Sequence, residues 1–128
     1  MGAPDPKPYV LVVEDEVDTR RTVERALRDA ALETVAVPDG AAALAQCQRH
    51  DPAAIVLDLA LPGLDGEKFA DAYRRIPQSR ARIIVISGTQ RGGEIAAKMR
   101  AYAYFSKPFR LDRLVEAAAK LVSEMPAT

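Results

Sequence analysis

The sequence has little of the chemistry on which several protein classes depend. It contains one cysteine, Cys47, one histidine, His50, and no tryptophan. A single cysteine cannot form an internal disulfide, and no cysteines and histidines occur at the spacing of a zinc site. These shortages exclude a disulfide-stapled domain and a structural zinc domain. A reducing cytoplasm is therefore the location that we expect.

An excess of one charge and a long apolar run are also missing. Eighteen basic residues balance eighteen acidic residues, so no overall field attracts the chain to nucleic acid or to an anionic membrane. No apolar stretch approaches the ~20 residues of a membrane span, and the first residues lack the apolar segment of a signal peptide. We expect no membrane contact and no direct nucleic-acid contact from this chain.

What the sequence does have is a regular alternation of short apolar runs and longer amphipathic segments. The apolar runs predict five strands, at 10–13, 33–37, 54–57, 83–86 and 103–106. Apolar residues at helical spacing predict five helices, at 17–30, 40–49, around 69–76, from 93 to about 100, and at 111–124. This (βα)5 pattern predicts an α/β fold: a doubly wound five-stranded parallel sheet of flavodoxin-like order 2-1-3-4-5. One domain at 9–124 is expected, between a flexible tail or linker at 1–8 and a C-terminal tail at 125–128.

Polar side chains follow four of the predicted strands at the point where each strand ends. Glu14 and Asp15 follow the first strand, and Asp58 follows the third. Ser87 ends the fourth strand, and Lys107 follows the fifth. These ends meet at one edge of a parallel sheet, where open α/β sheets bind their ligands. Three carboxylates at that edge predict a divalent-cation site, and Mg²⁺ is the favoured ion.

The lysine and the hydroxyl beside this site suit a phosphoryl group. Such a group has three outer oxygens, which a metal ion, an ammonium group and a hydroxyl can each hold. No histidine is placed to act as a base, and no hydrolase triad is present. The remaining carboxylate, Asp58, can then act as the nucleophile and form an aspartyl phosphate.

Four motifs resemble those of the receiver domain of two-component response regulators. They are V-V-E-D-E at 12–16, I-V-L-D-L-A-L-P-G-L-D-G at 55–66, V-I-S-G-T at 85–89 and Y-F-S-K-P-F at 104–109. They occur in the family's order, and the resemblance covers the chain from residue 9 to about 122. It implies a CheY-like signalling phosphoacceptor, not an enzyme. Its Asp58 takes a phosphoryl group from a phosphohistidine on a histidine kinase or a histidine phosphotransfer protein.

The resemblance also assigns the remaining residues of the site. It implies that Glu14 and Asp15 hold Mg²⁺ together with Asp58, and that the backbone carbonyl of Ala60 is a further ligand. Lys107 pairs with the phosphoryl group. The first acidic position departs from the family, because Glu14 stands where Asp is commoner. We expect its longer side chain to reach the metal through water.

A conformational switch is the third implication of the resemblance. Ser87 is the hydroxyl that moves toward the phosphoryl group, and the Lys107–Pro108 peptide bond is typically cis. Tyr104 matches the family's switch aromatic, although a half-buried strand aromatic would give the same pattern. The output face is formed by the fourth helix, the fifth strand and the fifth helix. Residues 91–113 carry six basic residues against two acidic ones, so we expect this face to meet an acidic downstream protein or a second copy of the chain.

The fourth helix is where the sequence departs most from the family. Arg100 replaces the usual glycine before the fifth strand, and the distance from Ser87 to Lys107 is about two residues shorter than usual. We therefore expect a reshaped turn there, and Gly92-Gly93 predict a mobile stretch before the helix.

Two other functions remain open. One is a receiver-like scaffold that acts without phosphorylation, against which the complete set of acidic residues and lysine argues. The other is a phosphatase that works through an aspartyl phosphate. Such enzymes commonly place a second Asp two residues after the nucleophile as a general acid. That position is Ala60 here, which cannot transfer a proton.

Overall fold

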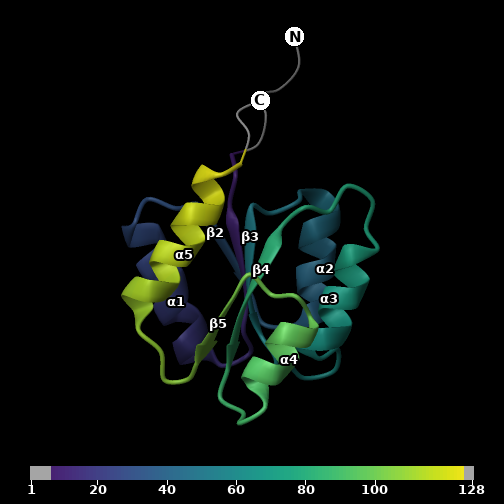
Figure 1. The fold of residues 1–128 in the computed structure, drawn as a ribbon. Helices are drawn as coiled ribbons and strands as arrows, with labels where there is room; N and C mark the ends of the chain where they lie inside the picture. The colour runs from purple at the N-terminus through teal and green to yellow at the C-terminus, as the bar shows by residue number, and fades with distance from the viewer. Residues whose placement is uncertain (1–6, 126–128) are drawn as a thin grey trace.

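Five strands and five helices alternate along the chain in the computed structural model, which describes residues 7–125 (Figure 1). The strands are β1 (Val10–Val13), β2 (Thr34–Val37), β3 (Ala54–Asp58), β4 (Arg82–Ser87) and β5 (Ala103–Ser106). The helices are α1 (Val17–Asp29), α2 (Gly40–Arg49), α3 (Gly66–Arg74), α4 (Gly92–Lys98) and α5 (Leu111–Ser123). Most of the two predicted tails, at 1–6 and 126–128, lies outside the described residues.

The strands form one parallel sheet in the order β2-β1-β3-β4-β5, which confirms the predicted topology. The chain first winds outward from β1 to β2 and then crosses back, so that β3 pairs with the other side of β1. The strand order thus reverses between β1 and β3. In doubly wound sheets a ligand crevice lies at this reversal, at the carboxyl ends of the strands.

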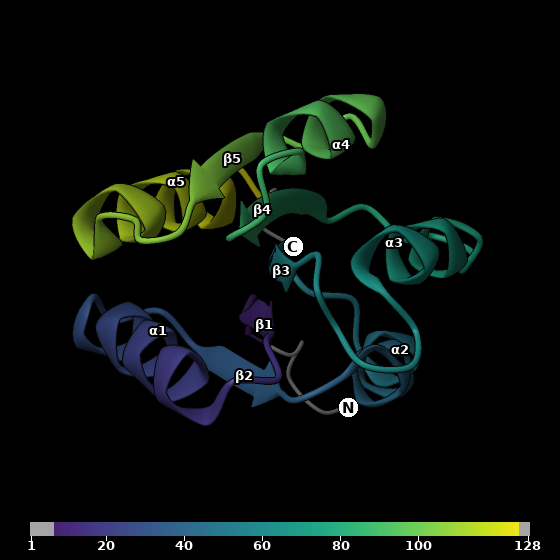
Figure 2. The ribbon, with the colours of Figure 1, turned by 90° about the horizontal axis from the view of Figure 1, so that it is seen from below.

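Helices cover both faces of the sheet and divide the apolar interior into two cores. Helices α1 and α5 pack on one face, and α2, α3 and α4 lie over the other (Figure 2). Side chains of β1 alternate between the cores: Val10 and Val12 point toward α1 and α5, whereas Leu11 and Val13 point toward the other side. Because both faces are covered, β1 (VLVV) and the first four residues of β3 (AIVL) are uninterrupted apolar runs, as buried parallel strands are.

Acidic side chains begin three of the helices. Asp39 accepts a hydrogen bond from Ala42 N at 2.8 Å at the start of α2, and Asp65 accepts one from Lys68 N at 2.9 Å at the start of α3. Glu16 is the N-cap of α1, where it accepts a hydrogen bond from Thr19 N. Such caps satisfy backbone N–H groups that the helix itself leaves free.

Helix α4 is shorter than the sequence indicated, ending at Lys98 instead of near Arg100. The chain leaves it through a Schellman-type turn, in which Ala101 N donates to Ala96 O at 3.0 Å and Arg100 N donates to Ala97 O at 3.1 Å. Arg100 has a φ of 58° there. Arginine therefore takes the left-handed conformation that glycine adopts without steric penalty.

Candidate functional site

Hydrogen bonds just beyond the strands fix the positions of the predicted site residues. Each of these bonds continues the ladder by one residue past a strand end. They are Glu14 N to Val37 O at 3.1 Å, Leu59 N to Ile86 O at 3.3 Å, and Lys107 N to Ser87 O at 2.8 Å. The strand ends therefore act as rigid supports for the acidic, hydroxyl and lysine side chains.

Three carboxylates meet at this edge. Glu14, Asp15 and Asp58 each offer an oxygen, and these oxygens all lie within 4.8 Å of one another. Glu14 and Asp58 are buried, whereas Asp15 is exposed. Like charges this close repel, and the burial of Glu14 and Asp58 weakens the screening of that repulsion by water.

Lys107 is the cation that the structure places among them. Its Nζ lies 2.6 Å from Glu14 Oε1 and 3.3 Å from Asp58 Oδ2. Two backbone N–H groups complete the surroundings: Ala60 N donates to Asp58 Oδ1 at 3.1 Å, and Glu16 N donates to Glu14 Oε2 at 3.3 Å. One lysine thus serves two of the three carboxylates, and it contacts Glu14 more closely.

The crowding is visible in the acid–base properties of the cluster. Burial, together with the neighbouring Asp58 carboxylate, raises the pKa of Glu14 to about 7, although Lys107 works in the opposite direction. Burial works to lower the pKa of Lys107, but its hydrogen bond to Glu14 and the charge of Asp58 outweigh that effect and raise it. Around neutral pH, Glu14 therefore retains in part a proton that an isolated glutamate would release.

This set of donors fits a divalent cation. All three acidic side chains offer hard oxygen ligands, and the carboxylate of Asp15 accepts no hydrogen bond from any of residues 7–125. Its exposed position leaves space for the water ligands that Mg²⁺ retains. A cation here would also offset the repulsion that Lys107 alone leaves uncompensated.

Ser87 and Tyr104 lie beside the cluster at the start of α4. Ser87 is buried, and its Oγ lies 3.1 Å from Thr89 Oγ1 and accepts a hydrogen bond from Thr89 N. A Cβ atom built on Gly92 would lie 2.7 Å from the Tyr104 hydroxyl and 2.8 Å from Ser87 Oγ. The phenol of Tyr104 therefore occupies space that is free because Gly92 has no side chain.

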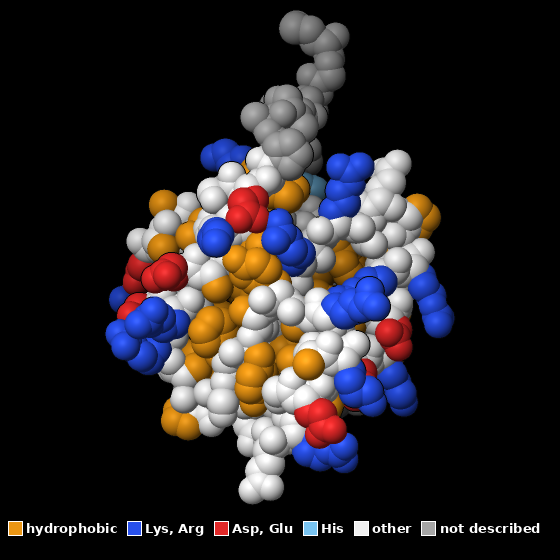
Figure 3. Space-filling model, viewed as in Figure 1, with side chains coloured by type: hydrophobic (Ala, Val, Ile, Leu, Met, Phe, Trp, Pro, Cys, Tyr) orange, Lys and Arg blue, Asp and Glu red, His pale blue; other side chains and the backbone are white. Residues whose placement is uncertain are grey.

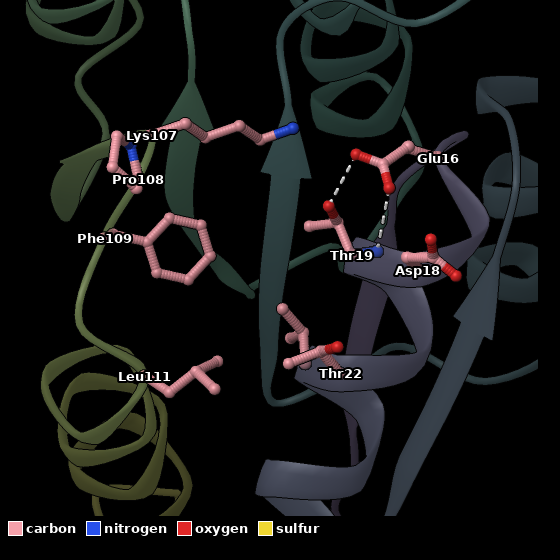
Figure 4. A pocket seen from close by; sticks show the side chains of 9 residues that line it. Glu16, Asp18, Thr19, Thr22, Lys107, Pro108, Phe109 and Leu111 are labelled. Atoms are coloured by element: carbon pink, nitrogen blue, oxygen red, sulfur yellow. Dashed lines mark hydrogen bonds between the residues drawn. The ribbon is translucent and has the colours of Figure 1, made fainter.

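A groove of about 540 Å³ opens next to Lys107, between α1 and the segment that joins β5 to α5 (Figure 4). Phe109 and Leu111 face Thr22 across it, while Glu16 and Asp18 lie at its acidic end. The Lys107–Pro108 peptide bond that lines it is cis. The groove joins an apolar surface directly to the charged cluster.

Comparison with known proteins identifies this arrangement. The family model of the response regulator receiver domain matches residues 10–119. The chain belongs to this family. The resemblance seen in the four sequence motifs is thereby confirmed, and the chain is a receiver domain of the two-component type.

Similar proteins agree with this assignment. The transcriptional regulatory protein PrrA of Mycobacterium tuberculosis is 35% identical over 123 residues, which cover 94% of this receiver and 52% of PrrA. The receiver domain of NtrX from Brucella abortus is 33% identical with a TM-score of 0.79, covering 91% of this chain and 99% of that one. A sensor protein from Polaromonas sp. is 29% identical with a TM-score of 0.82, covering 94% and 100%. The receiver spans about half the length of the curated relatives that it matches.

Sequence reasoning predicted the charged residues that the structure brings together at this edge, but it missed three neighbours that shape the cluster. Thr89 holds Ser87 Oγ, Gly92 makes room for Tyr104, and Arg20 contacts the backbone of the acidic turn. Only Thr89 lies within a family motif, S-G-T. For the other two, the sequence offered a glycine pair and an arginine five residues after Asp15, and neither pattern is specific by itself.

Proposed function

We propose that this receiver accepts a phosphoryl group on Asp58 from a phosphohistidine and so acts as a switch in a two-component or phosphorelay pathway. The donor is a histidine kinase or a histidine phosphotransfer protein, and the location is the cytoplasm. The observation that carries the proposal is the surroundings of Asp58. Its buried carboxylate lies beside two further carboxylates and within hydrogen-bonding distance of Lys107.

In the proposed transfer, an oxygen of the Asp58 carboxylate attacks phosphorus as the P–N bond to the donor imidazole breaks. A P–O bond forms, and the imidazole leaves as the neutral base, because its other ring nitrogen has taken up a proton from solvent water. Lys107 holds one outer oxygen of the phosphoryl group, and Ala60 N–H is close enough to Asp58 to hold another. Ser87 supplies a hydroxyl to the third oxygen after it releases Thr89.

The carboxylates of Glu14, Asp15 and Asp58 would hold Mg²⁺, with the backbone carbonyl of Ala60 as a further ligand. When bound, the ion neutralises negative charge on the transferring group and on the acidic cluster. Glu14 has to release its close contact with Lys107 in this state, because the ammonium group is then needed at the phosphoryl oxygen.

The groove beside Lys107 supports the proposed partner. It brings an apolar surface, formed by Pro108, Phe109 and Leu111, to the border of the phosphoryl site. A helical donor that presents its histidine at this border can bury apolar area in the groove, and such burial contributes roughly 25 cal/mol per Å².

The output is a change in the face formed by α4, β5 and α5. Movement of Ser87 toward the phosphoryl group changes the space available to the Tyr104 ring, because both side chains border Gly92. On this face, hydrophobic side chains gather in the middle with Lys and Arg side chains around them (Figure 3). Arg91 is paired with Glu94, and Arg110 with Asp112. Lys98, Arg100 and Arg113 form no ion pair within residues 7–125, and they suit an acidic downstream protein or a second copy of the chain.

The receiver thus assists its own phosphorylation and dephosphorylation, and it turns over no separate substrate. A phosphatase acting through an aspartyl phosphate would need a proton donor beside the leaving group. Ala60 stands where such an acid would be expected, and an alanine side chain cannot supply that proton.

The test is incubation with Mg²⁺ and a small phosphodonor such as acetyl phosphate, followed by intact mass spectrometry. Wild-type protein should gain one phosphoryl group, and Asp58→Asn should gain none. Lys107→Ala should bind Mg²⁺ but gain the group far more slowly. An unchanged wild-type mass, or equal gain by Asp58→Asn, would refute the proposal.

A further inference from the structure

The three acidic residues of the site are not held equally well. Glu14 contacts Lys107 and a backbone N–H, and Asp58 contacts Lys107 and Ala60 N. Asp15 has no such support for its carboxylate from residues 7–125, and its side chain is exposed. The direction in which this carboxylate points therefore depends on the main chain of the turn between β1 and α1.

The Arg20 side chain forms hydrogen bonds with the main chain of this turn. Arg20 Nη1 donates to Glu14 O at 3.0 Å and to Asp15 O at 3.2 Å. No backbone N–H of residues 7–125 donates to either carbonyl, because both precede the first hydrogen bond of α1, from Arg20 N to Glu16 O. A single guanidinium nitrogen thus bridges the two successive peptide groups that carry the acidic pair.

Arg20 is itself well anchored. It lies in the first turn of α1, which Glu16 caps through Thr19 N and Thr19 Oγ1, and the arginine is only half exposed. The planar guanidinium group loses little freedom for each hydrogen bond that it forms, which suits it to this role. The end of the helix and the metal-binding turn are thereby joined into one unit.

We propose that Arg20 is a positioning residue of the cation site, which fixes the turn so that the Asp15 carboxylate points toward Glu14 and Asp58. The inference rests on the proposed function only in taking this acidic cluster as the Mg²⁺ site. It assigns to Arg20 no contact with the metal, the phosphoryl group or the reacting atoms.

If Arg20 acted through its charge, its removal would change the Mg²⁺ affinity in one direction. If it acts by holding the turn, its removal changes the affinity in the other direction, so an experiment can distinguish the two. A cation beside three carboxylates repels Mg²⁺, so removal of its charge alone would strengthen Mg²⁺ binding. Loss of the two carbonyl contacts would instead release the turn and weaken binding. If Arg20 acts by position, its removal lowers the affinity despite the more negative site.

The experiment is a titration of the whole chain with Mg²⁺, followed by backbone amide NMR shifts or by calorimetry. Arg20→Ala should weaken Mg²⁺ binding roughly tenfold, the lower end of what loss of an outer partner of a metal ligand costs. Arg20→Lys keeps the charge but carries its nitrogen on a shorter side chain, so it should hold the two carbonyls less well and lie between wild type and Arg20→Ala. Arg21→Ala is the matched control, because Arg21 is the exposed neighbour and its side chain makes no hydrogen bond or ion pair with residues 7–125. It should bind Mg²⁺ as well as wild type or slightly better.

A double-mutant cycle tests the route through Asp15. In an Asp15→Asn background, adding Arg20→Ala should change the affinity by about twofold or less, because the carboxylate that Arg20 directs is absent. Unchanged or tighter binding by Arg20→Ala would overturn the proposal, as would a full tenfold effect in the Asp15→Asn background. If Arg20→Ala does not fold, Arg20→Lys decides in its place, and wild-type affinity in that variant overturns the proposal.

Mg²⁺ binding can be measured in protein that never accepts a phosphoryl group. Failure of the proposed function would appear as an unchanged mass with acetyl phosphate, and failure of this inference would appear in the Mg²⁺ titrations. The two results can therefore be told apart.

Discussion

The two ends of the sheet treat their carboxylates in opposite ways. At the carboxyl end, Glu14, Asp15 and Asp58 crowd together around a single lysine. At the amino end, both oxygens of Asp51 are used: Tyr73 OH donates to one at 2.6 Å, and Arg80 N donates to the other at 3.0 Å. The carboxyl end has too few hydrogen-bond donors for its three carboxylates, whereas at the amino end both oxygens of Asp51 have a donor.

The amino end is also closed by its tyrosines. Tyr73 OH accepts a hydrogen bond from Ala81 N at 2.7 Å while it donates to Asp51, which ties α3 to the start of β4. Tyr9 OH donates to His50 O and accepts a hydrogen bond from Gln46. Burial raises the pKa of Tyr9 to about 12, and it raises that of Tyr73 still further. These phenols remain neutral donors throughout the physiological range.

The difference shows which end of the sheet adds to the free energy of unfolding and which end reduces it. A satisfied polar network contributes to the free energy of unfolding, whereas repulsion among unsatisfied carboxylates reduces it until a ligand is bound. Substitutions at three places in the fold test this contrast, and they are ordered by the size of the expected effect.

The largest effect is expected at Glu14. Its pKa rises from 4.5 in the unfolded chain to about 7 in the folded one. The folded state therefore binds the proton more tightly, and stability falls as the pH rises from about 4.5 through about 7. Without divalent ions, Glu14→Gln should abolish this part of the fall, and at about pH 8 the variant should be more stable than wild type by on the order of 2–3 kcal/mol.

Urea unfolding at about pH 5 and about pH 8 measures this difference. Glu116→Gln is the control, since Glu116 is exposed on α5 and forms no ion pair within residues 7–125. Equal pH dependence in Glu14→Gln and wild type would show that the carboxyl end carries no such repulsion. Mg²⁺ should reduce the difference in stability between wild type and Glu14→Gln at the higher pH, because it stabilises wild type more than the variant.

A smaller effect of opposite sign is expected at the amino end. Tyr73→Phe keeps the ring packing but removes the hydroxyl, so Ala81 N and one oxygen of Asp51 lose their partner. The cost should be about 1–2 kcal/mol in urea unfolding, with Mg²⁺ affinity unchanged. Tyr102→Phe is the matched control, because the Tyr102 ring contacts Arg82 but its hydroxyl forms no hydrogen bond with residues 7–125. Equal stability of the two variants would remove the basis for the contrast.

The smallest effect on stability is expected at the glycine pair of α4. Alanine at either position gains helix propensity of roughly 0.5–1 kcal/mol. At Gly93 the new Cβ would come no closer than 3.3 Å to Tyr104, but at Gly92 it would lie 2.7–2.8 Å from Tyr104 and Ser87. Gly93→Ala should therefore show the gain, whereas Gly92→Ala should lose it and displace the Tyr104 ring.

Ring NMR signals of Tyr104 report this displacement. They should shift strongly in Gly92→Ala and little in Gly93→Ala. Similar shifts in both variants would mean that the position of the Tyr104 phenol does not depend on the missing side chain of Gly92.

The carboxyl end could be predicted from the sequence, but the amino end could not. Every predicted strand is present within one or two residues of its predicted bounds, because uninterrupted apolar runs such as 10–13 and 54–57 leave few alternatives. The parallel topology then brings Asp58 and Lys107 to one edge. The Tyr73–Asp51–Ala81 network has no periodic pattern, since its members come from a helix and two loops and meet only through tertiary packing.

The details of the site escaped prediction for a related reason. The sequence identified Glu14 as an unusual acid, but its 2.6 Å contact with Lys107 depends on the exact separation of β1 and β5 across the sheet. The end of α4 was misplaced because Arg100 is a poor candidate for a left-handed turn. Within residues 7–125, no helix is both long and apolar enough to cross a membrane.

The two cores of the sheet bear on how such a protein can diversify. Val12, Val56 and Ile86 belong to the compartment under α1 and α5, and Leu57 and Val85 belong to the one under α4. The two compartments lie on opposite faces of the sheet, and a change of side chain in one of them leaves the strand backbone between them in place. Mutations that repack α1 beneath the groove can therefore accumulate without loosening α4, and mutations beneath α4 can do the same in reverse. A lineage can therefore change the packing on one face of the sheet while it conserves the packing on the other.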